Sequence, residues 1–148
     1  MIAAVNGLAV GVGVTLLAQC DLVYAAETAN FRTPFIDLAL VPEGASSILM
    51  PAAVGHQRAN ELLLLGETWT AQEALAAGLV ARLFPADHLH EAVLDRARVI
   101  AAKPPGAMRA SKGLLATNTS AVLGRSVRLP DPYPPMRWSR INRNMLRK

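Results

Sequence analysis

The first twenty residues contain no charged side chain, and three glycines interrupt their apolar runs. The run Ile2 to Val5 predicts a short buried strand, and Asn6-Gly7 predicts a turn after it. Gly11-Val12-Gly13 forms a glycine-rich loop, and the apolar stretch over 14–19 predicts a short buried helix. Asp21 to Ala25 predicts the next strand. The order of strand, glycine loop, helix and strand indicates an α/β fold.

Helix signals follow one another from Ser46 onward. Ser46 or Ser47 can cap a helix that runs to Val54, because hydroxyls at that place accept hydrogen bonds from the free N–H groups of the first turn. Thr70-Ala71-Gln72-Glu73 fits a capping box, and Asp87 is the expected cap of a longer helix. The expected helices cover 46–54, 57–65, 71–77, 88–103 and 107–116, and further expected strands cover 29–33 and 79–84.

The chain is rich in apolar residues for its length of 148 residues, since 52% are hydrophobic and only 18% are charged. A small domain buries a smaller share of its surface than a large one. We therefore expect one domain whose remaining apolar surface is covered by another subunit or by another part of the same fold.

Cysteine and histidine usage gives little support to a disulfide or a metal site. Cys20 is the single cysteine of the sequence, which excludes an internal disulfide and fits a reducing compartment. His88 and His90 stand two residues apart on an expected helix, so their side chains point to different faces. We expect no metal.

The net charge of +4 is unevenly distributed. Arg32 is the only basic residue before Gly55, whereas the segment from Arg125 to the end holds seven basic residues against Asp131. Such a tail is compatible with nucleic-acid binding, but we favour a solvated terminus. The prolines over 129–136 exclude a regular helix there. We expect no nucleic-acid partner.

The charge-free start also resembles an export signal or a membrane helix in its hydropathy. No basic residue precedes the apolar run, and Asn6, Thr15 and Gln19 interrupt it. It is also rich in glycine where a membrane helix favours leucine. We expect a cytoplasmic protein with no membrane partner, and the peroxisome and the mitochondrion stay open as alternatives.

Glu43 is the only ionisable residue between Ala39 and Ala53. Pro42 stiffens the approach to it, and Gly44 allows a sharp turn after it. A lone carboxylate in such a segment is either a general base in an apolar pocket or an acid at a helix start facing water. Asp37 is the competing acid, and we interpret it as an ordinary carboxylate of a loop or strand end.

Several short motifs, taken together, resemble one superfamily. They are Ile2-Ala3-Ala4-Val5-Asn6-Gly7, Gly11-x-Gly13, Cys20-Asp21, Thr70-Ala71-Gln72-Glu73-Ala74 and Ala77-Gly78-Leu79-Val80. From Met1 to about Leu115 the chain resembles the crotonase (enoyl-CoA hydratase/isomerase) superfamily. Within it, the segments most similar to Δ3,Δ2-enoyl-CoA isomerases are Thr33-Pro34, Pro42-Glu43-Gly44-x-Ser46-Ser47 and Pro104-Pro105-x-Ala107-x-Arg109-x-Ser111-Lys112.

The resemblance implies a fold and a substrate class. The implied fold is the C-terminal part of a crotonase (ClpP-like) ββα spiral over 1–118, followed by C-terminal helices, with a divergent basic, proline-rich tail over 119–148. The N-terminal part of the family's fold, which supplies the other oxyanion donor, is expected to be absent. The implied substrate is an acyl-CoA thioester, with no cofactor, and the implied assembly is a homo-oligomer, a trimer or hexamer.

The resemblance also implies roles for individual residues. The backbone N–H of Val12 would polarise the thioester carbonyl. Gly11 and Gly13, on either side of it, would bind the substrate, because glycine allows the backbone to approach closely. Glu43 would be the general base, and Lys112 would approach the CoA phosphates or be a surface lysine.

Hydratases of this superfamily use two glutamates, which would fall at Thr15 and Phe35. Because neither residue carries a carboxylate, the sequence favours an isomerase of fatty-acid oxidation that converts 3-enoyl-CoA to 2-trans-enoyl-CoA. A hydratase-type enzyme and a non-catalytic acyl-CoA-binding subunit are the alternatives. Leu62 to Leu65 could line an acyl pocket, but such a run, like Trp69, is more often core.

Overall fold

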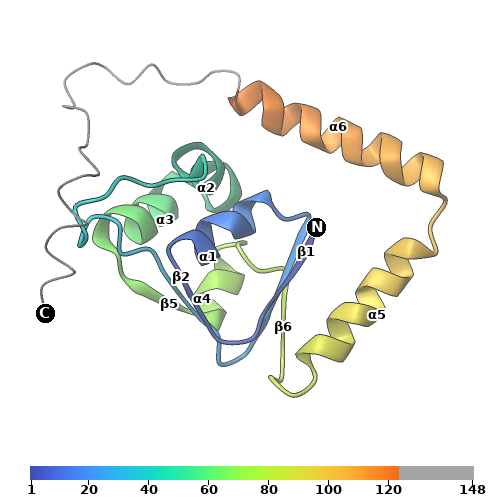
Figure 1. Ribbon diagram of the computed structural model, residues 1–148, viewed down its shortest axis with the longest axis horizontal. Helices are drawn as coiled ribbons and strands as arrows, with labels where there is room; N and C mark the ends of the chain where they lie inside the picture. Colours follow the sequence, from blue (N-terminus) through green and yellow to red (C-terminus); the bar gives the residue numbers. More distant parts are fainter. Residues whose placement is uncertain (124–148) are drawn as a thin grey trace, which may run out of the picture.

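A computed structural model describes residues 1–123 of the chain, with side chains through residue 115 (Figure 1). The strands are β1 (Ile2–Val5), β2 (Leu8–Val10), β3 (Leu22–Ala26), β4 (Asn30–Arg32), β5 (Thr68–Thr70) and β6 (Arg82–Phe84). The helices are α1 (Val12–Thr15), η1 (Leu16–Gln19), α2 (Ser46–Val54), α3 (His56–Asn60), η2 (Glu61–Leu65), α4 (Ala71–Ala76), α5 (Leu89–Ala101) and α6 (Pro105–Leu123). The predicted α/β class is confirmed.

The first sheet is parallel, with the strand order β1-β3-β6. Ile2 pairs with Leu22, and Ala26 pairs with Phe84. Four of the five residues of β3 are buried, as expected for a central strand of a parallel sheet. Helix α5 packs against all three strands through a face that includes the buried Leu89 and Val93.

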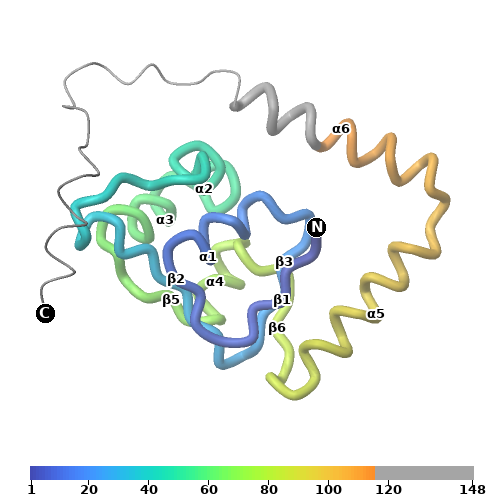
Figure 2. The backbone as a smooth tube through the Cα atoms, viewed as in Figure 1, coloured from blue at the N-terminus to red at the C-terminus, as the bar shows by residue number. Residues whose placement is uncertain are grey.

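The second sheet has the order β2-β4-β5, with β2 parallel and β5 antiparallel to β4. The backbone passes from β1 to β2, returns through α1 and η1 to β3 beside β1, and crosses again to β4 (Figure 2). The sequence does not predict strands β2 and β5. In β2 only Ala9 is buried, whereas Leu8 and Val10 are exposed.

Two of the three predicted helix caps are wrong. Helix α2 has the predicted bounds and ends at Gly55, but its N-cap is Ala45, with a φ of 58° and no side-chain cap. Helix α5 begins after His88 rather than after Asp87, and its N-cap also makes no side-chain bond. The third cap is confirmed.

That third cap is the capping box of α4. The Thr70 hydroxyl accepts a hydrogen bond from the Glu73 N–H, and the Glu73 carboxylate accepts one from the Thr70 N–H. The Thr70 N–H and the Thr70 hydroxyl both donate to the Glu73 carboxylate, at 2.7 Å and 2.8 Å, and these two bonds lower the pKa of Glu73 because they stabilise its charged form.

The leucine run over 62–65 is divided between the core and the surface. Leu62 and Leu63 are buried, while Leu64 and Leu65 are exposed. The run lies on the π-helical turn η2, and the buried Thr33 hydroxyl donates a hydrogen bond to the Leu62 carbonyl. Trp69 is buried, as predicted.

Helix α6 is longer than the predicted 107–116, since it runs from Pro105 to Leu123. It contacts α2. Of the predicted tail over 119–148, residues 124–148 lie outside the described residues, as do the basic and proline-rich positions on which its interpretation rests.

Candidate active site

Glu43 lies in the loop that joins β4 to α2. The next two residues, Gly44 and Ala45, have φ angles of 63° and 58°, both in the left-handed region. The Glu43 carbonyl accepts hydrogen bonds from the Ser46 hydroxyl at 2.6 Å and from the Ser46 N–H at 3.1 Å. The predicted cap Ser46 therefore donates its hydroxyl back to the loop, and this turn fixes the backbone on which the carboxylate is carried.

The carboxylate of Glu43 is held by a buried hydroxyl from a distant part of the chain. The Thr15 hydroxyl donates a hydrogen bond to Oε1 of Glu43 at 2.6 Å. Thr15 is 1% exposed, whereas Glu43 itself is exposed. The Gln19 side-chain amide donates to the Gly44 carbonyl at 3.0 Å. The carboxylate thus lies at the surface, with one of its oxygens bound to the interior.

Val12 is the first residue of α1 and lies one helical turn before Thr15. Gly11 has a φ of 55°, and its N–H donates to the Arg32 carbonyl at 2.8 Å, which ties the loop to β4. The N–H groups of Val14 and Thr15 donate to the Gly11 carbonyl. The first N–H groups of a helix have no acceptor within it, and within residues 1–123 no acceptor is bonded to the Val12 N–H.

Val12 and Glu43 are brought together through Thr15. The Thr15 hydroxyl lies 3.4 Å from the Val12 carbonyl and 2.6 Å from the Glu43 carboxylate. The Thr15 hydroxyl therefore links the first residue of α1 to the Glu43 carboxylate.

The other predicted site residues are placed differently. Gly13 packs near Ala9, because a Cβ at Gly13 would lie 3.9 Å from the Ala9 Cβ. The Lys112 ammonium lies 2.8 Å from the Asp21 carboxylate. This contact raises the pKa of Lys112 and is the main cause of the lowered pKa of Asp21. Lys112 is thus in an ion pair that joins α6 to the start of β3.

Asp37, the competing acid, also forms an ion pair. Its carboxylate accepts a hydrogen bond from the Arg32 guanidinium at 3.0 Å, and Arg32 also donates to the Gly66 carbonyl. Phe35 is 6% exposed and lies in the hydrophobic core. Of the two acids in this loop, Glu43 is the one with no basic partner among the described residues.

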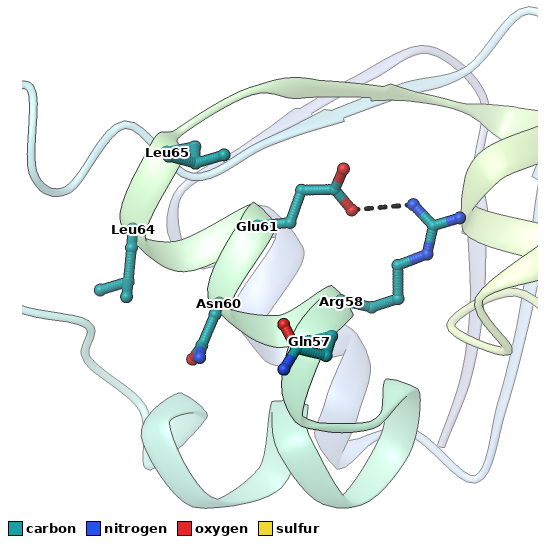
Figure 3. Close-up of a pocket in the computed structure, with 6 residues that line it drawn as sticks. All are labelled: Gln57, Arg58, Asn60, Glu61, Leu64 and Leu65. Atoms are coloured by element: carbon teal, nitrogen blue, oxygen red, sulfur yellow. Dashed lines mark hydrogen bonds and ion pairs between the residues drawn. The ribbon is translucent and has the colours of Figure 1, made fainter.

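The exposed leucines of η2 border a surface pocket of about 490 Å³. Figure 3 shows its lining on α3 and η2, with the guanidinium of Arg58 paired with Glu61 at 2.8 Å. The lining residues are Gln57, Arg58, Asn60, Glu61, Leu64 and Leu65. Neither Glu43 nor Val12 is among them, so this pocket and the candidate site are built from separate residues.

Residues 1–129 match the family described as enoyl-CoA hydratase/isomerase. The chain belongs to the enoyl-CoA hydratase/isomerase family. It is 45% identical over 118 residues to Enoyl-CoA delta isomerase 2 of Rattus norvegicus, a match that covers 80% of this chain and 30% of that protein. It is 42% identical over 115 residues to the peroxisomal Enoyl-CoA delta isomerase 3 of Mus musculus, covering 78% of this chain and 36% of that protein.

A solved member of the family confirms the crotonase fold of this chain. The crystal structure of the enoyl-CoA hydratase/isomerase from Pseudoalteromonas atlantica T6c superposes with a TM-score of 0.79 at 47% identity. The match covers 83% of this chain and 50% of that structure. This family member thus spans about a third of the length of the two curated relatives and half of the solved chain.

Sequence reasoning missed the residues that hold the Glu43 loop. From the sequence, Thr15 and Gln19 have no assigned role in the site: both are polar interruptions of an apolar stretch, and Thr15 is also a position without an acid. A threonine inside a buried helix was the available signal, because a buried hydroxyl needs a partner. The partner itself lies 28 residues away and could not be named from local sequence.

Three further observations bear on the chemistry open to this family member. Burial raises the pKa of the Cys20 thiol, which keeps it protonated at neutral pH. No three metal-binding side chains among the described residues are grouped closely enough to hold an ion. In the same part of the chain, none of the helices has the length and apolar character needed to span a bilayer.

Proposed function

We propose that this chain is an acyl-CoA double-bond isomerase that converts 3-enoyl-CoA to 2-trans-enoyl-CoA, with Glu43 as its single base. The Glu43 carboxylate takes a proton from C2 of the substrate. The electron pair of the C2–H bond moves into the thioester, and a dienolate forms. Glu43 then returns the proton to C4, the double bond comes to lie between C2 and C3, and the thioester carbonyl is restored.

The placement of Glu43 is the observation that carries the proposal. Glu43 is exposed, is fixed at its backbone by Ser46, and has one oxygen bound to Thr15. The position of the first hydratase acid holds the Thr15 hydroxyl, and that of the second holds the buried Phe35. Addition of water in the family calls for two carboxylates, whereas moving one proton between two carbons calls for one.

Stabilisation of the dienolate is assigned to the N–H of Val12. Negative charge grows on the thioester oxygen as C2 loses its proton, and a donor aimed at that oxygen lowers the barrier. The family resemblance implies a second backbone donor from the part of the fold that precedes the first strand of this match. Loss of one such donor costs on the order of 100- to 1,000-fold in kcat, which sets the size of the contribution expected from the Val12 N–H.

The proposal also covers the setting of the reaction. The process is fatty-acid oxidation, in the cytoplasm or alternatively in the peroxisome or mitochondrion, and the acting form is a homo-oligomer. The exposed Leu114 and Leu115 of α6, at 73% and 70%, supply apolar surface for such an assembly. Sedimentation of the purified chain as a monomer at assay concentration would remove the oligomer from the proposal.

The decisive experiment compares three measurements on the purified full chain. Isomerisation is followed as the gain in ultraviolet absorbance when 3-enoyl-CoA becomes conjugated, hydration as the loss of absorbance from 2-enoyl-CoA, and binding by titration with the acyl-CoA. We expect isomerisation without hydration, and no isomerisation by Glu43→Gln. Hydration at a comparable rate would contradict the single-base mechanism, and binding without turnover would make the chain an acyl-CoA-binding subunit instead.

A further inference from the structure

The hydrogen bond between Thr15 and Glu43 distinguishes the two oxygens of the carboxylate. The donor is a nearly fully buried hydroxyl, and the 2.6 Å separation is that of a short, charge-assisted bond to an ionised acceptor. It involves Oε1, and no other hydrogen bond to the Glu43 carboxylate is made within the described side chains. Oε2 is therefore the oxygen left available to a substrate.

A second contact from the same helical segment holds the backbone next to the carboxylate. Gln19 ends η1, four residues after Thr15, and both side chains reach the loop that carries Glu43. Gln19 binds the Gly44 carbonyl while Thr15 binds the Glu43 side chain. A Cβ at Gly44 would lie 3.5 Å from the Gln19 amide and 3.6 Å from the Thr15 hydroxyl. The turn is thus packed directly against both side chains.

We propose that Thr15 is a positioning residue for the base Glu43. The Thr15 hydroxyl fixes Oε1 of the carboxylate, so that Oε2 alone carries the proton from C2 to C4. The inference rests on the proposed function and adds to it the identity of the reacting oxygen. Rotation of the carboxyl group would exchange the two oxygens and break the bond to Thr15. The bond therefore keeps one oxygen directed at the substrate throughout the transfer.

Positioning matters because the Glu43 side chain is exposed and is held by this one hydrogen bond among the described residues. An exposed glutamate samples many rotamers, and ordering such a side chain costs conformational entropy. Because the Thr15 hydroxyl holds the carboxylate in the free protein, the side chain is already ordered when the substrate binds. Misplacement of a reacting group by about 1 Å can reduce the rate on the order of a hundredfold.

The test compares Thr15→Val, which removes the hydroxyl at nearly constant volume, with Thr15→Ser, which keeps it. The matched control is Thr33→Val, because Thr33 is equally buried and its hydroxyl donates to the Leu62 carbonyl, away from Glu43. Thr15→Val is expected to lower kcat on the order of 10- to 100-fold. Its KM should stay within about twofold of the wild-type value, because uniform binding is unchanged. Thr15→Ser and Thr33→Val should keep the wild-type kcat per folded molecule.

Deuterium uptake gives a readout that a purely structural role would not change. In heavy water, a firmly held carboxyl returns the same proton to C4, whereas a loose one exchanges it with solvent. The fraction of product with deuterium at C4 should rise in Thr15→Val and stay at the wild-type value in Thr33→Val. An active Thr15→Val protein with unchanged kcat and unchanged deuterium uptake would overturn the inference, as would equal losses in Thr15→Val and Thr15→Ser.

A measurement without substrate separates this inference from the proposed function. In protein labelled with ¹³C at the glutamate carboxyl, Glu43→Gln identifies the Glu43 signal. That signal should move in Thr15→Val and remain in place in Thr33→Val. If the wild-type chain does not isomerise, the proposed function and the catalytic role of Thr15 both fail, and the carboxyl signal still reports whether the contact exists. If the chain is active and the signal does not move, the positioning role alone is refuted.

Discussion

Gly44→Ala should destabilise the protein through backbone strain rather than through a steric clash. Gly44 has a φ of 63°, and a Cβ there would find its nearest neighbours, on Gln19 and Thr15, at 3.5 Å and 3.6 Å. These are ordinary contact distances, so no side chain has to move. The strain of a left-handed residue with a Cβ is roughly 1–2 kcal/mol. Restriction of the unfolded chain by alanine returns about 0.4–1 kcal/mol, so the net loss of unfolding free energy is about 1 kcal/mol.

The neighbouring residue provides a control that should not lose stability. Ala45 already has a Cβ at a φ of 58°. Ala45→Gly removes that strain but gives the unfolded chain more freedom, so it should be neutral or stabilising by less than about 1 kcal/mol. Two substitutions at adjacent positions, which exchange the same two residue types, should therefore differ in outcome: Gly44→Ala lowers the unfolding free energy and Ala45→Gly does not.

The assay is urea unfolding followed by circular dichroism, with thermal unfolding as a second measurement. For a chain of this size, about 1 kcal/mol corresponds to a shift in Tm of roughly 2–4 °C. Gly44→Ala should lower the urea midpoint without changing the slope of the transition. A Gly44→Ala protein as stable as the wild type, or a loss of stability in both variants, would refute the strain argument and the left-handed turn beside Glu43.

Three further predictions concern the base, a helix cap and an ion pair. Glu43→Gln should abolish isomerisation and leave acyl-CoA affinity largely unchanged, as measured by turnover and by titration; residual turnover equal to that of the wild type would remove Glu43 from the mechanism. Thr70→Ala should lower the unfolding free energy by about 1 kcal/mol through loss of the cap of α4, and urea unfolding that shows no loss would contradict the capping box. The pair of Asp21 with Lys112 lowers the pKa of Asp21, so its contribution to stability is complete above the ordinary pKa of 3.8 and is lost as the pH falls through the lower pKa of the folded carboxyl. Lys112→Ala should therefore reduce the difference in stability between neutral and strongly acidic solution, and a difference equal to that of the wild type in urea titrations would exclude this contact.

Features that depend on local chemistry could be predicted from the sequence. The strand over Ile2–Val5 follows from an apolar run ended by a turn, and the capping box at Thr70 follows from two side chains three residues apart. The predicted side-chain caps of α2 and α5 are wrong, because neither helix has a side-chain hydrogen bond at its N-cap. Ser46 lies one residue inside α2, because the left-handed Gly44 and Ala45 turn the chain so that its hydroxyl reaches the Glu43 carbonyl.

The arrangement around the candidate base could be predicted only in part. The sequence and the family resemblance singled out Glu43 and the loop at Val12. The bond that joins them through Thr15 depends on β2 pairing with β4 and on η1 packing against α2, which are contacts between distant segments. The two ends of the run from Leu62 to Leu65 differ in burial for the same reason, since the π-helical turn η2 redirects the side chains in a way that a count of leucines does not contain.

The alternation of the chain between its two sheets has a consequence for how the protein folds and unfolds. One sheet draws its strands from residues 2–84 and the other from residues 8–70, so the two sets are interleaved along the chain. Within each sheet, paired strands such as β1 with β3 and β2 with β4 are separated along the chain by a strand of the other sheet. Such non-local pairing slows folding. A single protease cut in the exposed loop around residues 36–39 would separate strands of both sheets at once. The base-bearing loop is therefore also a place where one broken peptide bond would leave each sheet with strands on two fragments.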